Sequence, residues 1–142
     1  MTVAIDQEYG QAGYLKVNLV GNDTAAGAVG EVANPEGQAL FIIESYLYFE
    51  VASTAASTFN IGIGATGEDA SDLMSAMPMN KTAGTLWQVV DKDTAAEAQL
   101  ASPGGLAWAA DTFLTVTSAA FVSTGLKACL LIKYLRLGDL AQ

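Results

Sequence analysis

Residues 39–51, ALFIIESYLYFEV, form the strongest predicted element of the chain. Successive side chains of a strand point to opposite faces. The odd positions form one apolar face, made of Phe41, Ile43, Leu47, Phe49 and Val51. The even positions are Leu40, Ile42, Glu44, Tyr46, Tyr48 and Glu50. This second face is also partly apolar, so we expect it to contact more than water. A long helix is the competing interpretation, but the aromatic and β-branched content and the period of two favour a strand.

Shorter segments with strand character lie on both sides of this run. Residues 14–20, YLKVNLV, alternate with Leu15, Val17 and Leu19 on one face, and residues 58–64, TFNIGIG, repeat the pattern. Further strands are predicted near 85–90, 106–109, 112–118 and 126–137. Several short strands separated by glycine-rich turns are typical of an all-β chain. We therefore predict an antiparallel β-sandwich, jelly-roll-like, with an extended N-terminal arm.

The segments between the predicted strands set the domain organisation. Residues 1–13 and 21–38 are rich in small residues, and we expect an arm and a long loop there. A loop over 65–84 is expected to include one short helical turn near 71–76, and 91–101 could form a short helix. Because no linker divides the chain, we predict a single domain. Its residues 1–30 form the arm and first strand, and residues 31–142 form the sandwich.

Composition limits the classes of partner. The chain has 51% apolar and only 15% charged residues, against about 25% charged in a typical soluble domain. Part of its surface is therefore expected to be covered by another subunit. The net charge of −9 disfavours direct DNA or RNA binding, which depends on cations that displace counterions. We expect no membrane partner, because the N-terminus lacks a signal pattern and the longest apolar stretch, 106–122, contains Asp111.

Catalytic chemistry finds little support in the residue types. The chain contains no histidine, which removes Ser–His–Asp and Cys–His arrangements and histidine-based metal sites. Its single cysteine, Cys129, allows no internal disulfide and is expected to be a buried, inert thiol. Glu44 and Glu50 would lie about 20 Å apart on one strand, too far for a glycosidase pair. We predict a protein that is not an enzyme and has no cofactor or metal.

Three weaker patterns have plainer interpretations. Glu68, Asp69 and Asp72 could offer oxygen ligands to calcium, but their spacing is not that of a calcium loop, and acidic loop residues usually face water. The glycines of NIGIGATGED resemble a dinucleotide-binding pattern, but an acidic loop follows them. Trp87 and Trp108 could line a sugar-binding platform, although packing in the core is the plainer explanation.

Two long segments resemble a family of small virion proteins from tailed bacteriophages. The first is residues 33–84, in which an Asn-Pro turn leads into the long strand, an Ile-Gly-Ile strand and a Ser-Asp-x-Met loop. The second is residues 108–137, with a Thr-Val-Thr strand, a Thr-Gly-Leu turn and a final aliphatic strand. The resemblance covers about residues 31–137 and consists of turn and strand residues rather than catalytic motifs. It implies a β-sandwich component of the virion.

The resemblance also implies a task and partners. A head decoration or cement protein would bind the major capsid protein and sister subunits, as a homotrimer at local three-fold positions. The expected interface residues are Tyr46, Tyr48, Leu40 and Ile42 for subunit contact and Tyr9, Tyr14 and Leu15 for the arm. The alternative hypothesis is a tail or head-fibre component with a receptor- or glycan-binding role, in which Trp87 and Trp108 would be exposed.

Overall fold

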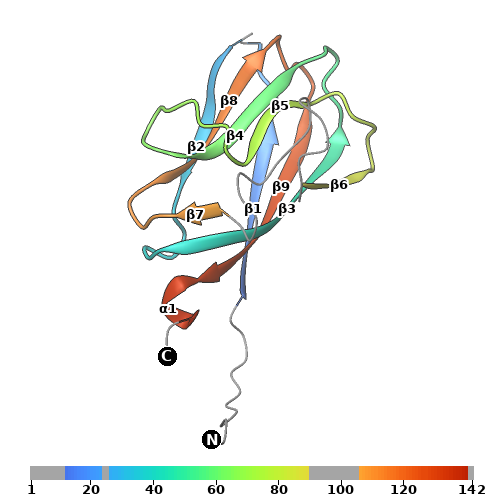
Figure 1. Cartoon of the computed structure of the whole chain (residues 1–142). Helices are drawn as coiled ribbons and strands as arrows, with labels where there is room; N and C mark the ends of the chain where they lie inside the picture. The colour runs from blue at the N-terminus through green and yellow to red at the C-terminus, as the bar shows by residue number, and fades with distance from the viewer. Residues whose placement is uncertain (1–11, 24–25, 90–105, 141–142) are drawn as a thin grey trace, which may run out of the picture.

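Two antiparallel β-sheets packed face to face make up the protein (Figure 1). The structure is a computed structural model and describes residues 12–23, 26–89 and 106–140. The first sheet has the order β1-β9-β3-β6, with β7 also pairing with β3. Its strands are β1 (Ala12–Val20), β3 (Leu40–Val51), β6 (Leu86–Val89), β7 (Leu106–Trp108) and β9 (Lys127–Arg136). The second sheet has the order β2-β8-β4-β5. Its strands are β2 (Gly27–Ala33), β4 (Thr58–Gly64), β5 (Met74–Pro78) and β8 (Phe113–Ala120).

The strand order confirms the predicted all-β fold. Apart from β7, each sheet has four strands, and most connections cross from one sheet to the other. β1, β3, β6 and β9 lie in one sheet and β2, β4, β5 and β8 in the other, which is the arrangement of a jelly roll. A short helix, α1 (Leu137–Leu140), follows β9. Within the described residues, no helix reaches the length and apolarity that a bilayer crossing requires.

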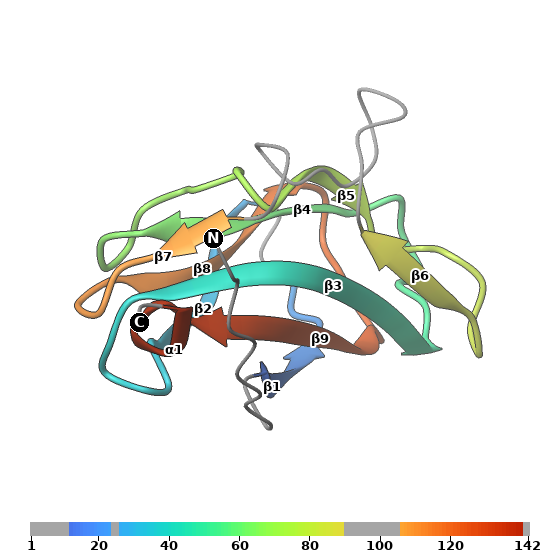
Figure 2. The ribbon, with the colours of Figure 1, turned by 60° about the horizontal axis from the view of Figure 1, so that its bottom comes forward.

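The core lies between the two sheets, which Figure 2 shows as two layers. Inward side chains of the central strands are fully buried, among them Leu47 and Phe49 of β3 and Leu114 of β8. Every second residue of β9 from Ala128 to Tyr134 also points inward. Burying an aliphatic or aromatic side chain of this size contributes about 1.5–3 kcal/mol. The alternation in the sequence is therefore the main source of the sandwich's stability.

A β-bulge in β3 changes which face each residue occupies. The pairing of β3 with β9 shifts register between Ile42 and Glu44, which leaves Ile43 as the extra residue. Leu40 and Ile42 are fully buried before the bulge, whereas Phe41 and Ile43 are only partly buried. The expected face of odd positions is thus wrong for the first half of β3, correct at Leu47 and Phe49, and wrong again at Val51, which is exposed after a second register shift between Phe49 and Val51. An inserted residue reverses the alternation, because the period of a strand is two.

Two other expected elements differ from those in the structure. Residues 71–76 contain no helical turn, because β5 begins at Met74 and pairs with β4. The expected loop over 21–38 contains β2, which pairs with β8 despite its many small residues. Most of the expected arm and the possible helix at 91–101 lie outside the described residues.

A polar cluster fixes the end of β9 to the turn before β3. Glu36 accepts hydrogen bonds from the Tyr134 hydroxyl at 2.6 Å and from Arg136 at 2.8 Å. The hydrogen bond from Arg136, followed by that from Tyr134, lowers the pKa of the Glu36 carboxyl. Burial and the hydrogen bond to Glu36 raise the pKa of Tyr134. Asn34 closes the same turn, since its side chain accepts from the backbone N–H groups of residues 36 and 37 and donates to the carbonyl of Trp108. The cluster holds the C-terminal strand in register with its neighbour.

Candidate subunit-interface site

The outer face of the first sheet is the candidate functional site. We use this name for the side chains of β1, β3, β6 and β9 that point away from the core. They are Tyr14, Lys16, Asn18, Val20, Phe41, Ile43, Glu44, Tyr46, Tyr48, Glu50, Val51, Leu86, Lys127, Cys129, Leu131, Lys133 and Leu135. Several are large and accessible: Tyr14 is 75% exposed, Leu86 53% and Tyr48 38%. Strand alternation thus places apolar and charged groups together on one flat surface.

The centre of the outer face is aromatic and aliphatic. Tyr46 of β3 pairs with Leu131 of β9, which in turn pairs with Lys16 of β1. In the adjacent row, Tyr48 pairs with Cys129. Side chains directly opposite on neighbouring strands lie about 4.5–5.5 Å apart at Cβ, so these groups form a continuous patch. Tyrosine and aliphatic side chains in such a patch are typical of protein interfaces.

The charges on the outer face are sorted by strand. β3 carries Glu44 and Glu50, whereas β9 carries Lys127 and Lys133 and β1 carries Lys16. These three lysines are half of the six cationic residues of a strongly acidic chain. Among the described residues, none of the three forms a salt bridge with a carboxylate. An acidic strand therefore lies beside a basic one.

Two tyrosines of the outer face have polar or charged partners within the chain. The Tyr46 hydroxyl donates a 2.9 Å hydrogen bond to the Glu44 carboxylate. This hydrogen bond is the largest cause that raises the pKa of the Tyr46 phenol, with desolvation next. The ammonium group of Lys133 lies 6.0 Å from the centre of the Tyr14 ring. The hydrogen bond to Glu44 thus orients the Tyr46 ring on the outer face.

The structure separates the predicted interface residues into three groups. Tyr14, Tyr46 and Tyr48 lie on the outer face. Leu40, Ile42 and Leu15 point the other way: the first two are fully buried and Leu15 packs against the core. The expectation that Leu40 and Ile42 face a partner is corrected, because the β3 bulge turns both side chains into the core, whereas a contact by the partly buried Leu15 stays a prediction. Tyr9 lies outside the described residues.

Sequence reasoning missed the contribution of β9 to the outer face. Residues 127–135 alternate as Lys127, Cys129, Leu131 and Lys133 on one side and small or aliphatic residues on the other. That alternation could have placed these side chains on one face of a strand. The position of β9 between β1 and β3 could not be predicted, because it joins segments about 80 or more residues apart. Cys129 was expected to be buried, but it is only partly so.

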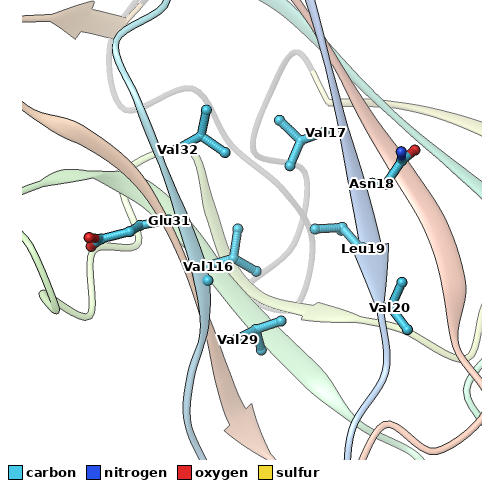
Figure 3. A pocket seen from close by; sticks show the side chains of 9 residues that line it. Val17, Asn18, Leu19, Val20, Val29, Glu31, Val32 and Val116 are labelled. Carbon is cyan, nitrogen blue, oxygen red and sulfur yellow. The ribbon is translucent and has the colours of Figure 1, made fainter.

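A groove opens between the edge strands of the two sheets. It encloses about 250 Å³ between β1 and β2. Figure 3 shows Val17 and Leu19 of β1 facing Val29 and Val32 of β2, with Val116 at the base and Glu31 directed away. The groove is mostly apolar and brings together no set of catalytic groups.

The acidic loop after β4 is occupied by its own hydrogen bonds. Asp72 accepts from the backbone N–H of Ile63 at 2.8 Å, and Glu68 accepts from that of Ala65 at 2.8 Å. Asp69 accepts from the side chains of Asn60 and Thr117. Each carboxylate therefore helps to fold the loop. No group of three acidic or cysteine side chains suited to a metal ion occurs among the residues that the structure describes.

The tryptophans do not form a sugar-binding platform. Trp108 is fully buried, and its indole N–H donates to the carbonyl of Thr112 at 3.1 Å. Trp87 is partly buried against the core, and the Lys81 ammonium lies 4.6 Å from its ring centre. The exposure of both rings that the glycan-binding hypothesis requires is therefore not found.

Comparisons with known proteins give a match in fold. No protein-family model matches the chain, and no curated protein matches it. A chain from the structure described as "Capsid of Ralstonia phage GP4" aligns with a TM-score of 0.55 and 16% identity, covering 96% of this chain and 91% of that one. A chain from "Cyanophage Pam1 capsid asymmetric unit" aligns with a TM-score of 0.50 and 18% identity, covering 96% and 93%. At these identities the likeness shows a shared fold that extends over nearly the whole of each chain.

Proposed function

We propose that this protein is a structural component of a phage capsid, namely a decoration or cement protein that binds the capsid lattice and stabilises the head. The observation that carries the proposal is the full-length match in fold to chains from two phage capsid structures. The sequence resemblance of residues 31–137 to small virion proteins supports the same conclusion independently. The proposed setting is the virion, and the proposed role is structural rather than enzymatic.

The outer face supports a role in assembly. It combines a central patch of tyrosine and aliphatic side chains with charges of both signs, and no described element of the chain covers Tyr14 or Leu86. We propose that sister copies meet through this face, with Tyr14, Tyr46 and Tyr48 in contact. The homotrimer implied by the sequence resemblance is the proposed unit on the capsid lattice, and its three-fold contacts would use surfaces other than the outer face.

Association of copies would explain how modest contacts hold a shell together. When copies are linked, the second attachment to the lattice becomes intramolecular, and overall binding can exceed that of one copy by about 10²–10⁴-fold. Each decoration unit would then bridge neighbouring capsid subunits. The apolar core between the sheets keeps each copy rigid, so that its contacts are not lost to flexing.

Co-sedimentation tests the proposal. Purified protein is mixed with capsids of its own phage that lack it, and bound protein is measured after the capsids are pelleted. The proposal predicts saturable binding with a fixed number of copies per capsid and slower release of DNA on heating. Absence of binding to both expanded and unexpanded capsids would contradict it. Bovine serum albumin, another acidic protein, controls for nonspecific pelleting.

A further inference from the structure

We infer that the outer face binds the outer face of a second copy of this chain, about a two-fold axis that runs parallel to the strands between β3 and β9. The juxtaposition that points to this is the acidic strand β3 beside the basic strand β9. The inference deepens the proposed assembly role by naming the partner of this face and the geometry of contact. It concerns the isolated protein and does not require capsid binding.

The two-fold operation brings opposite charges together. Rotation by a half turn about this axis lays β3 of one copy over β9 of the other and preserves position along the strands. Glu44 and Lys133 are direct partners in the β3–β9 register, so they occupy the same row. In the pair of copies, Glu44 therefore faces Lys133 of the second copy. Symmetry forms this contact twice, as in any isologous interface.

The apolar groups match under the same operation. Tyr46 and Leu131 share one row and Tyr48 and Cys129 the next, so each tyrosine lies over an aliphatic or thiol side chain of the second copy. Two sheets that pack face to face lie about 10 Å apart with strands within about 30° of each other, a spacing that side chains of this size fill. The patch would thus be buried, with the Glu44–Lys133 contacts beside it.

A different axis gives an unfavourable arrangement. A two-fold axis in the plane of the sheet but perpendicular to the strands would lay β3 over β3 and β9 over β9. Glu44 and Glu50 would then face acidic groups, and Lys127 and Lys133 would face basic ones. Like charges across an interface cost several kcal/mol. The distribution of charge therefore selects the axis parallel to the strands. Since this contact closes on two copies, three-fold contacts would use other surfaces.

Complementary charge reversal tests the inference. Two variants are prepared, Glu44→Lys and Lys133→Glu, each in tagged and untagged form. In either variant alone, like charges would meet at both symmetry-related contacts, and self-association is expected to weaken by about a hundredfold or more. In the mixture, Lys at position 44 of one chain faces Glu at position 133 of the other, and the unchanged Glu44 faces the unchanged Lys133. The mixture is therefore expected to associate much more strongly than either variant alone.

The readout is the amount of untagged chain that copurifies with tagged chain, together with the mass by analytical ultracentrifugation. Asp111→Lys, a matched charge reversal at an exposed turn outside the outer face, is expected to associate like the wild type. Circular dichroism confirms that each variant is folded. A monomeric wild type, variants that self-associate normally, or a mixture no stronger than its components would each overturn the inference. Capsid binding that persists in those cases would leave the proposed function intact.

Discussion

The bulge at Ile43 makes a sharp prediction about two neighbouring isoleucines. Ile42 is fully buried between the sheets, whereas Ile43 is partly exposed on the other side of β3. Truncation of either residue to alanine removes the same atoms from adjacent positions. The difference between Ile42→Ala and Ile43→Ala therefore measures the face that each side chain occupies, with little contribution from intrinsic strand propensity.

The magnitude for Ile42→Ala follows from its burial. The change removes about three methylene equivalents at ~0.8 kcal/mol each, or roughly 2.4 kcal/mol. A residual cavity of about 40 Å³ at ~24 cal/mol per Å³ adds about 1 kcal/mol. We therefore expect Ile42→Ala to lower the free energy of unfolding by about 3–4 kcal/mol, within the 2–5 kcal/mol range for such changes. Ile43→Ala is expected to lower it by about 1 kcal/mol, the usual cost at a partly exposed position.

Urea denaturation followed by tryptophan fluorescence and circular dichroism is the assay. A lower midpoint with an unchanged slope reports lost stability rather than a changed unfolded state. If β3 kept a strict period of two through residues 39–51, Ile43 would share the core face with Leu47 and Phe49. Ile43→Ala would then be the more damaging change. That order, or equal losses, would refute the bulge.

Three further predictions concern the polar cluster, a tight glycine and a strained turn. Because the folded-state pKa of Glu36 is lowered, its contribution to stability is present above its ordinary value of 4.5 and is lost as the pH falls through the folded-state pKa. The melting temperatures of wild type and Glu36→Gln should therefore converge towards low pH. A difference in melting temperature that stays constant with pH would count against the cluster. A Cβ at Gly62 would lie 2.7 Å from the carbonyl carbon of Ala70. Gly62→Ala should therefore lower the free energy of unfolding, measured by urea denaturation, by about 1–3 kcal/mol. Gly30→Ala, where the added Cβ meets open space, should lower it less. Phe121 has a φ of 61° and its side chain is 63% exposed. Because asparagine tolerates this left-handed conformation, Phe121→Asn should leave the melting temperature unchanged or raise it. A marked loss of stability would show that the ring has a structural contact.

The local pattern of residues predicted much of the fold, because alternation is a property of each strand by itself. The segments at 14–20, 39–51 and 58–64 became β1, β3 and β4 with boundaries close to those expected. β2 was missed because Gly27–Ala33 has few large apolar residues and is held by pairing with β8. The β3 bulge was also invisible, since an inserted residue leaves no mark on an apolar run and depends on the register with a distant strand.

The candidate site shows the same division between local and long-range information. The tyrosines at 14, 46 and 48 could be placed on an accessible face from alternation alone. Leu40 and Ile42 were misplaced, because their face depends on the bulge a few residues later. The sorting of acidic and basic strands could not be predicted, because it arises only when β9 inserts between β1 and β3.

An electron cryomicroscopy map of the intact phage particle would show whether this protein is part of the capsid. We predict density for this sandwich on the outside of the capsid shell, at repeated lattice positions, in contact with the major capsid protein and with sister copies. Density confined to the tail, or a particle that contains no copy of the chain, would contradict the account.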